Sequence, residues 1–298
     1  MRKALLPALA ILVAATWGQD GPAGAVPPPS AGSSPYMVTT SIDWRRRVLS
    51  IDVSLDFKKA GLSLPEGRLT AERMVARDLP GLAKDAFFSI PVDSEGTIGD
   101  SVLDGRLSID SILRLTAGLR HVGDSFSQDI LSFRSRWELP LGSAAALFVD
   151  WGKARSLPEP LGWTATKDYT GIVIYADGML PVKGERGVYD NLRPGLFARI
   201  LDEETNIVMD RWVVDPAALV DEGPLGYVTA RSSGDEARVG DDPLLVRAAG
   251  LFGVNRTDIV IDDADAARIL DSAANRALIA EGRIIVVIKP DKSTAAGG

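Results

Sequence analysis

The chain contains 298 residues, with a net charge of −7, no Cys and a single His. The absence of Cys excludes disulfides, thiol nucleophiles, thiolate metal sites and a lipid-modified N-terminal Cys. One His excludes every two-His metal site and leaves one candidate imidazole base. We therefore expect no cofactor and no metal. The composition excludes these classes of function but does not indicate which function the protein has.

The N-terminus is predicted to be a signal peptide, residues 1–25. Arg2 and Lys3 precede an apolar run from Ala4 to Ala15, which matches a secretory core and is too short to cross a bilayer as a helix. Residues 26–35 are rich in Pro, Gly and Ser, so we expect a disordered tether. The protein is predicted to be periplasmic, with association with the outer membrane as the alternative, and with no transmembrane segment in the mature chain.

Two domains follow in the prediction, residues 36–160 and 161–290, and a disordered tail over 291–298. Pro and Gly near the boundary interrupt any periodic pattern. From residue 26 on, the net charge is −1 before residue 163 and −7 from there to the end. An acidic second half argues against nucleic-acid binding, which needs a basic face.

The N-terminal domain begins with a strand in which Leu49, Ile51 and Val53 alternate with polar residues, as in a sheet with one buried face. The remaining elements expected in this domain are a helix over 68–90 that Pro80 should kink or split, a helix over 104–119, a strand over 131–139 and a hairpin partner over 144–149. This order predicts an antiparallel sheet with helices on one face.

The C-terminal domain is predicted to contain more strands than helices. The expected elements are strands over 169–175, 196–201, 207–209, 243–252, 258–261 and 283–288, and one helix after Ile261 that reaches Ala277. The continuous apolar run of the last strand is typical of a strand covered on both faces. The fold class is therefore α+β, with two small domains and antiparallel or mixed sheets with helices packed on one face.

Two short motifs resemble catalytic or metal sites. His121 and Asp124 could form a triad with Ser125, but His121 is also suited to closing a helix C-terminus. The loop from Asp93 to Asp100 lacks the Gly and Glu positions of an EF-hand, so a turn followed by a helix cap is the alternative. We expect no catalytic residue, and the protein is predicted not to be an enzyme.

Other residues are candidates for binding. The acidic cluster Asp258, Asp262, Asp263 and Asp265 is either a Ca²⁺ site or a set of helix caps. Arg45-Arg46-Arg47 is either a solvated strand start or a docking point. Trp151, Trp163 and Tyr169 are predicted as an interaction surface at the domain junction, although aromatic residues there also pack domains together.

The C-terminal half resembles bacterial envelope and flagellar accessory proteins of the FlgP/FlgT type and related small outer-membrane lipoproteins, over about residues 169–288. The segments that carry the resemblance are Tyr169-Thr-Gly-Ile-Val-Ile, Arg199-Ile-Leu-Asp-Glu, Arg238-Val-Gly-Asp-Asp-Pro, Thr257-Asp-Ile-Val-Ile-Asp-Asp and Arg283-Ile-Ile-Val-Val-Ile. The resemblance implies a periplasmic α+β module in oligomeric assemblies at the flagellar motor or outer membrane. It implies no reaction.

From these observations we expect a secreted periplasmic structural or assembly protein of the envelope, with a flagellar association as the finer expectation. Its expected partners are envelope or flagellar-motor proteins, or further copies of the chain. Nucleic acid is not an expected partner. The alternative is a periplasmic carbohydrate- or peptidoglycan-binding module that uses the region of Trp151 and Trp163.

Overall fold

The computed structural model describes residues 34–63, 67–152, 154–157 and 164–290, and its residues from Pro35 onward form one compact unit. The predicted signal peptide, nearly all of the tether and the tail lie outside the described residues. The fold is α+β with two domains, each built on its own sheet. No helix among the described residues is long and apolar enough to span a membrane.

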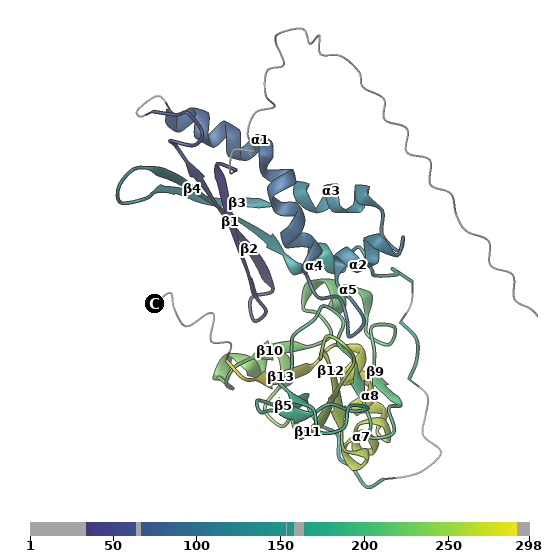
Figure 1. Ribbon diagram of the computed structural model, residues 1–298. Coiled ribbons are helices and arrows are strands. Elements are labelled where there is room, and N and C mark those ends of the chain that lie inside the picture. The colour runs from purple at the N-terminus through teal and green to yellow at the C-terminus, as the bar shows by residue number, and fades with distance from the viewer. Residues whose placement is uncertain (1–33, 64–66, 153, 158–163, 291–298) are drawn as a thin grey trace, which may run out of the picture. The chain divides into compact units, whose positions relative to one another are not determined.

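The first domain is a four-stranded antiparallel sheet, in the order β1-β2-β4-β3, whose inner face is covered by helices (Figure 1). Its strands are β1 (Tyr36–Asp43), β2 (Val48–Asp56), β3 (Arg120–Phe126) and β4 (Ser132–Pro140). Its helices are α1 (Gly67–Phe88), α2 (Ile98–Leu103), α3 (Ile109–Ala117) and α4 (Leu141–Ala145).

The period-two pattern of β2 gives this sheet one buried face, as predicted. Ile51 and Val53 are buried in the core, whereas Asp52 between them faces the other side. Helix α1 covers the buried face with the stripe Ala71, Val75, Leu79, Ala83, Ala86 and Phe87. The helix continues through Pro80 as one element, so Pro80 does not split it.

Two predictions for this domain are wrong, and a third has different bounds. The helix expected over 104–119 is α3, which begins only at Ile109 because Ser108 caps it after the turn that follows α2. His121 lies on strand β3 rather than at a helix end. The residues expected as a hairpin partner, 144–149, begin in the short helix α4, and β4 pairs instead with β2 and β3.

The second domain is a seven-stranded mixed sheet in the order β10-β13-β5-β11-β12-β8-β9. These strands are β5 (Ile172–Ala176), β8 (Ile200–Leu201), β9 (Ile207–Met209), β10 (Gly226–Val228), β11 (Leu244–Phe252), β12 (Asp258–Ile261) and β13 (Ile284–Ile288). A separate small ribbon pairs β6 (Leu180–Pro181) with β7 (Tyr189–Asp190). The helices are α5 (Pro216–Asp221), the 3₁₀ turn η1 (Ser233–Asp235), α6 (Glu236–Val239), α7 (Asp263–Leu270) and α8 (Ala273–Ala280).

Most strand predictions for this domain are confirmed, including the continuously buried β13. The single helix expected after Ile261 is two helices, because the Ser272 side chain accepts the N–H of Asn275 and starts α8. The helices carry the chain from β12 past β11 and β5 to β13, as a crossover on a mixed sheet requires.

Candidate functional site

Strand β1 forms one edge of the first sheet, and the ladder indicates which of its backbone groups face outward. The N–H of Asp56 donates to the carbonyl of Pro35 at 2.9 Å, so this pair is hydrogen-bonded. Antiparallel ladders alternate hydrogen-bonded and non-hydrogen-bonded pairs. The backbone groups of Val38, Thr40 and Ile42 therefore point away from β2 and toward the outer edge.

The side chains along this edge are mostly uncharged and well exposed. Between Tyr36 and Asp43 the sequence contains no charged residue, and Met37 is 66% exposed. Charged side chains, especially Lys, are a common device that prevents edge strands from pairing with other chains. Among the described residues, no strand covers the outer edge of β1, so it is a candidate site for strand addition.

The opposite edge, β3, differs in composition and geometry. Its pairing with β4 shifts register between His121 and Gly123, which is the irregularity of a β-bulge. His121 Nε2 lies 2.8 Å from Asp124 Oδ1, and the His121 ring packs on Trp137 at 4.8 Å between centroids. Ser125 forms no hydrogen bond with His121 among the described residues, so the structure does not assemble the candidate triad.

The turn between β1 and β2 contacts the second domain, and the three arginines lie in or beside it. Arg45 donates to the Ser232 hydroxyl at 3.1 Å, and Arg47 donates to the carbonyl of Leu219 at 3.4 Å. The ring of Trp44 packs edge-on against the ring of Tyr227, with 5.9 Å between the ring centroids. Arg45 and Arg47 therefore hold the two domains of this chain together, and docking of the basic run to a partner stays a prediction.

Burial changes the titration of the groups at this contact. Desolvation lowers the pKa of the Arg47 guanidinium and raises the pKa of the Tyr227 hydroxyl, because burial removes the water that would stabilise the charged form of each group. The neighbouring helices α4 and α5 are also closely packed. A Cβ on Gly142 of α4 would lie 2.4 Å from the carbonyl oxygen of Val220 in α5, so the site has no room for a side chain. These contacts argue for a structural role of the turn.

The loop from Asp93 to Asp100 is a second contact with the C-terminal domain rather than a metal loop. Asp93 Oδ1 accepts the N–H groups of Glu95 and Gly96, and Thr97 and Asp100 form a capping box at the start of α2. The backbone of the loop forms a hydrogen bond with the C-terminal domain, because the N–H of Asn255 donates to the Ser94 carbonyl at 3.1 Å. The alternative of a turn followed by a helix cap is therefore supported here.

The acidic residues predicted as a cluster near the C-terminal helices each have a different hydrogen-bonding partner. Asp258 is fully buried and binds Arg199, at 2.7 Å to its Nη2, while Arg199 also donates to the Ser94 hydroxyl. Asp262 caps α7, and Asp263 accepts the N–H of Glu203. Among the described residues, no three acidic or His side chains are grouped to hold a metal ion.

The predicted aromatic surface is only partly visible. Trp163 lies outside the described residues. Trp151 is 64% exposed, whereas Tyr169 is half-buried against the core with the Lys167 ammonium over its ring at 5.1 Å. Within the described chain, no ring contact joins Trp151 to Tyr169. The sequence analysis did not predict β1 or β3, the two edge strands of the first sheet. The alternation of Val38 and Ile42 with polar residues was a weak signal for β1.

The two domains match two family models. The model described as the Treponema pallidum Tp0624 N-terminal domain matches residues 35–147, and that of the Tp0624 second domain matches residues 171–291. No curated protein matches the chain. These matches name no activity and do not bear on the resemblance to flagellar accessory proteins. The chain therefore carries, in the same order, domains similar to the N-terminal and second domains of Tp0624.

Proposed function

We propose that this protein is a structural or assembly protein of the bacterial envelope that acts through protein–protein contacts in the periplasm. The observation that carries the proposal is the outer edge of β1, an eight-residue strand with a row of outward backbone groups. The basic and apolar segment at residues 2–15 supports secretion. The proposed activity is assembly, and no reaction is assigned.

The proposed contact is strand addition. An extended segment of a partner pairs with an exposed edge through main-chain hydrogen bonds, and its side chains give specificity. The outward N–H and C=O groups of Val38, Thr40 and Ile42 would provide these bonds on β1. The β1–β2 ladder is left intact, because its bonds use the alternate residues.

The partner that best fits this edge is a second copy of the chain. Two antiparallel copies of β1 centred on Thr40 would place Val38 opposite Ile42 and Thr39 opposite Ser41. Val38 and Ile42 both lie on the helix-covered face, since they pair with the buried residues Val53 and Leu49. Such a pairing sets apolar against apolar and hydroxyl against hydroxyl, and opposes no like charges.

A proline in β1 tests this contact. Thr40→Pro removes one outward donor without removing a bond to β2, and proline is tolerated on edge strands. We expect the unchanged chain and Thr40→Val, which keeps the N–H, to dimerise with rising concentration in sedimentation, and Thr40→Pro to stay monomeric. Equal association of the two variants, or a monomer throughout, would contradict pairing of two copies.

The wider role is tested in the intact bacterium. A photo-crosslinking amino acid at Thr40 should capture a specific protein in the periplasm, either this chain or another. The same amino acid at Leu103, which is 84% exposed on α2, is the matched control. Absence of any Thr40-specific product would overturn the assembly role. The finer flagellar proposal rests on the family resemblance, and normal swimming with an unaltered motor after gene deletion would contradict it.

The second candidate function is binding of carbohydrate or peptidoglycan. The observation that favours it is the exposed Trp151 ring, since aromatic faces stack on sugars. Retention of the protein on purified cell wall, lost in Trp151→Ala, would support this function. Absence of retention would remove it.

A further inference from the structure

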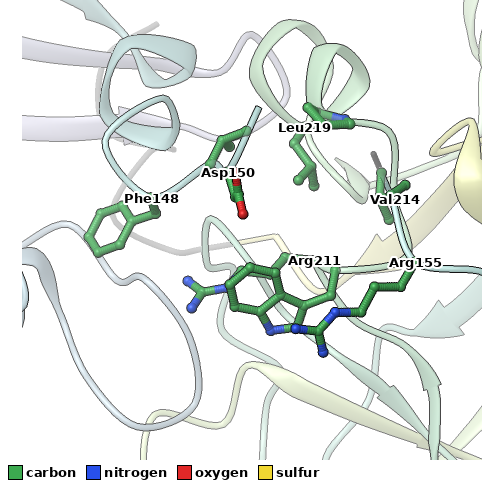
Figure 2. A pocket seen from close by; sticks show the side chains of 10 residues that line it. Phe148, Asp150, Arg155, Arg211, Val214 and Leu219 are labelled. Atoms are coloured by element: carbon green, nitrogen blue, oxygen red, sulfur yellow. The ribbon is translucent and has the colours of Figure 1, made fainter. Parts of the chain in front are cut away.

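A small pocket lies beside the segment that links the two domains (Figure 2). Its volume is about 70 Å³, enough for several waters or for one terminal group of a larger ligand. The wall residues come from the end of the first domain, the linking segment and the second domain. They include Phe148, Asp150, Arg155, Arg211, Trp212 and Leu219.

Two guanidinium groups at this pocket have no anionic partner in the part of the chain that the structure describes. Arg155 Cζ lies 5.0 Å and Arg211 Cζ 4.7 Å from the centre of the Trp212 ring. The backbone N–H of Arg155 donates to the Trp212 carbonyl at 2.7 Å, which holds the two segments together. Among the described residues, neither guanidinium forms an ion pair or a hydrogen bond.

The charge on Arg211 is only partly compensated by its surroundings. Burial lowers the pKa of its guanidinium, and the carboxylates of Asp93 and Asp210 oppose this from beyond ion-pair distance, while Arg106 adds to it. The Asp210 carboxylate is already engaged by the N–H of Trp212 at 2.9 Å. A partly desolvated cation without a partner is unfavourable, so an anionic group entering the pocket would gain charge-assisted hydrogen bonds.

The opposite wall limits which anion fits. In Figure 2, Asp150 and Leu219 point into the pocket from the side opposite Arg155 and Arg211. Asp150 Oδ1 accepts the N–H of Gly152 at 3.1 Å, and its other oxygen accepts no hydrogen bond among the described residues. A ligand that brings an N–H donor beside its anionic group would satisfy both walls, whereas an anion without a donor would only be repelled by Asp150.

We propose that this pocket binds the terminal carboxylate of a peptide that ends in an apolar residue. The carboxylate would enter the pocket beside Arg155 and Arg211, and the adjacent amide N–H would donate to Asp150, which is exposed at the edge of the pocket. The apolar side chain would remain at the mouth of the pocket, toward Phe148. This site is separate from the β1 edge, so Thr40→Pro should leave its ligand binding unchanged and the two proposals can fail independently.

Three small probes separate the requirements of the pocket. N-acetyl-leucine has the carboxylate, the N–H and the apolar side chain. N-acetyl-leucinamide lacks the carboxylate, and 4-methylpentanoate lacks the N–H. We expect N-acetyl-leucine to shift the Trp212 indole N–H signal saturably in NMR of the full chain, 4-methylpentanoate to bind more weakly, and the amide to cause no saturable shift.

Matched variants assign the effect to the pocket. Arg155→Gln should weaken N-acetyl-leucine binding roughly tenfold, as expected for loss of a charged hydrogen bond, whereas Arg134→Gln on the exposed sheet face should not. Asp150→Asn should narrow the difference between N-acetyl-leucine and 4-methylpentanoate. Equal binding of acid and amide, equal weakening by the two Arg variants, or no binding of any probe would overturn the proposal.

Discussion

The two sheets of this protein end in different ways. The first sheet ends in β1 and β3, strands of eight and seven residues, and its second face carries polar side chains. The second sheet ends in β9 and β10, which have three residues each, and its central strands are buried on both faces. Short edges offer few unpaired backbone groups. The first sheet is therefore the one suited to the addition of a strand from another chain. The second sheet, with its short edges, forms the core of its domain.

Within the first sheet the two edges also differ. The β3 edge carries Arg120, His121 and Asp124 and a register shift, both features that discourage pairing with another chain. The β1 edge has neither between Met37 and Ile42. This difference explains why the proposed contact is assigned to one edge.

The largest effect is expected where the second sheet meets the first domain. Asp258→Ala would leave Arg199 without its buried partner and remove the acceptor for the Arg199 backbone N–H. Breaking a buried ion pair by removing one member costs about 3–5 kcal/mol. Urea unfolding should show this loss, and a loss below about 1 kcal/mol would contradict the assigned role of the pair.

A smaller pair of effects compares the two sheets directly. Ile174→Ala in β5 removes a fully buried side chain and should lower the free energy of unfolding by about 2–5 kcal/mol. Met37→Ala in β1 should change it by no more than about 0.5 kcal/mol, because the side chain is exposed. Comparable losses for both would indicate that the face of β1 opposite to the helices is covered.

The smallest effect concerns the attachment of β1 to α1 and depends on pH. Hydrogen bonds from Arg77 and from the Tyr36 hydroxyl, at 2.5 Å, lower the pKa of Asp78 to about 2 from 3.8. A depressed pKa in the folded state stabilises the protein above about pH 3.8, and this contribution is lost as the pH falls toward 2.

The contribution of Asp78 should be below about 1 kcal/mol, because Arg77 is largely exposed. The unfolding free energies of the unchanged chain and Asp78→Asn should therefore differ at pH 5 and converge near pH 2. A difference that persists at low pH would contradict the assignment.

The sequence was most informative where one pattern dominates. Alternation in β2 and the continuous apolar run of β13 predicted both strands, because burial on one or two faces leaves a direct trace in the residue order. Strand β1 was missed because Thr39, Thr40 and Ser41 interrupt the apolar alternation. The helix break at Ser272 was missed because a cap inside an Ala-rich run does not disturb the helical period.

The sites depend on contacts between distant residues, which periodicity does not reveal. Arg199 and Asp258 are 59 positions apart, and both residue types are common on surfaces. Arg155 lies at the same pocket as Arg211 because its backbone N–H donates to the Trp212 carbonyl. The sequence pointed to Trp151 nearby, since an aromatic residue at a junction is visible without the fold, but it did not indicate the arginine pair.

Amide hydrogen exchange in β1 tests the central claim most directly. In dilute solution the amides of Met37, Thr39 and Ser41 should be protected by β2, whereas those of Val38, Thr40 and Ile42 should exchange rapidly. On assembly, the second set should gain protection and the first should remain protected. If Val38, Thr40 and Ile42 are already protected in the monomer, or stay unprotected in the assembly, β1 is not the contact edge.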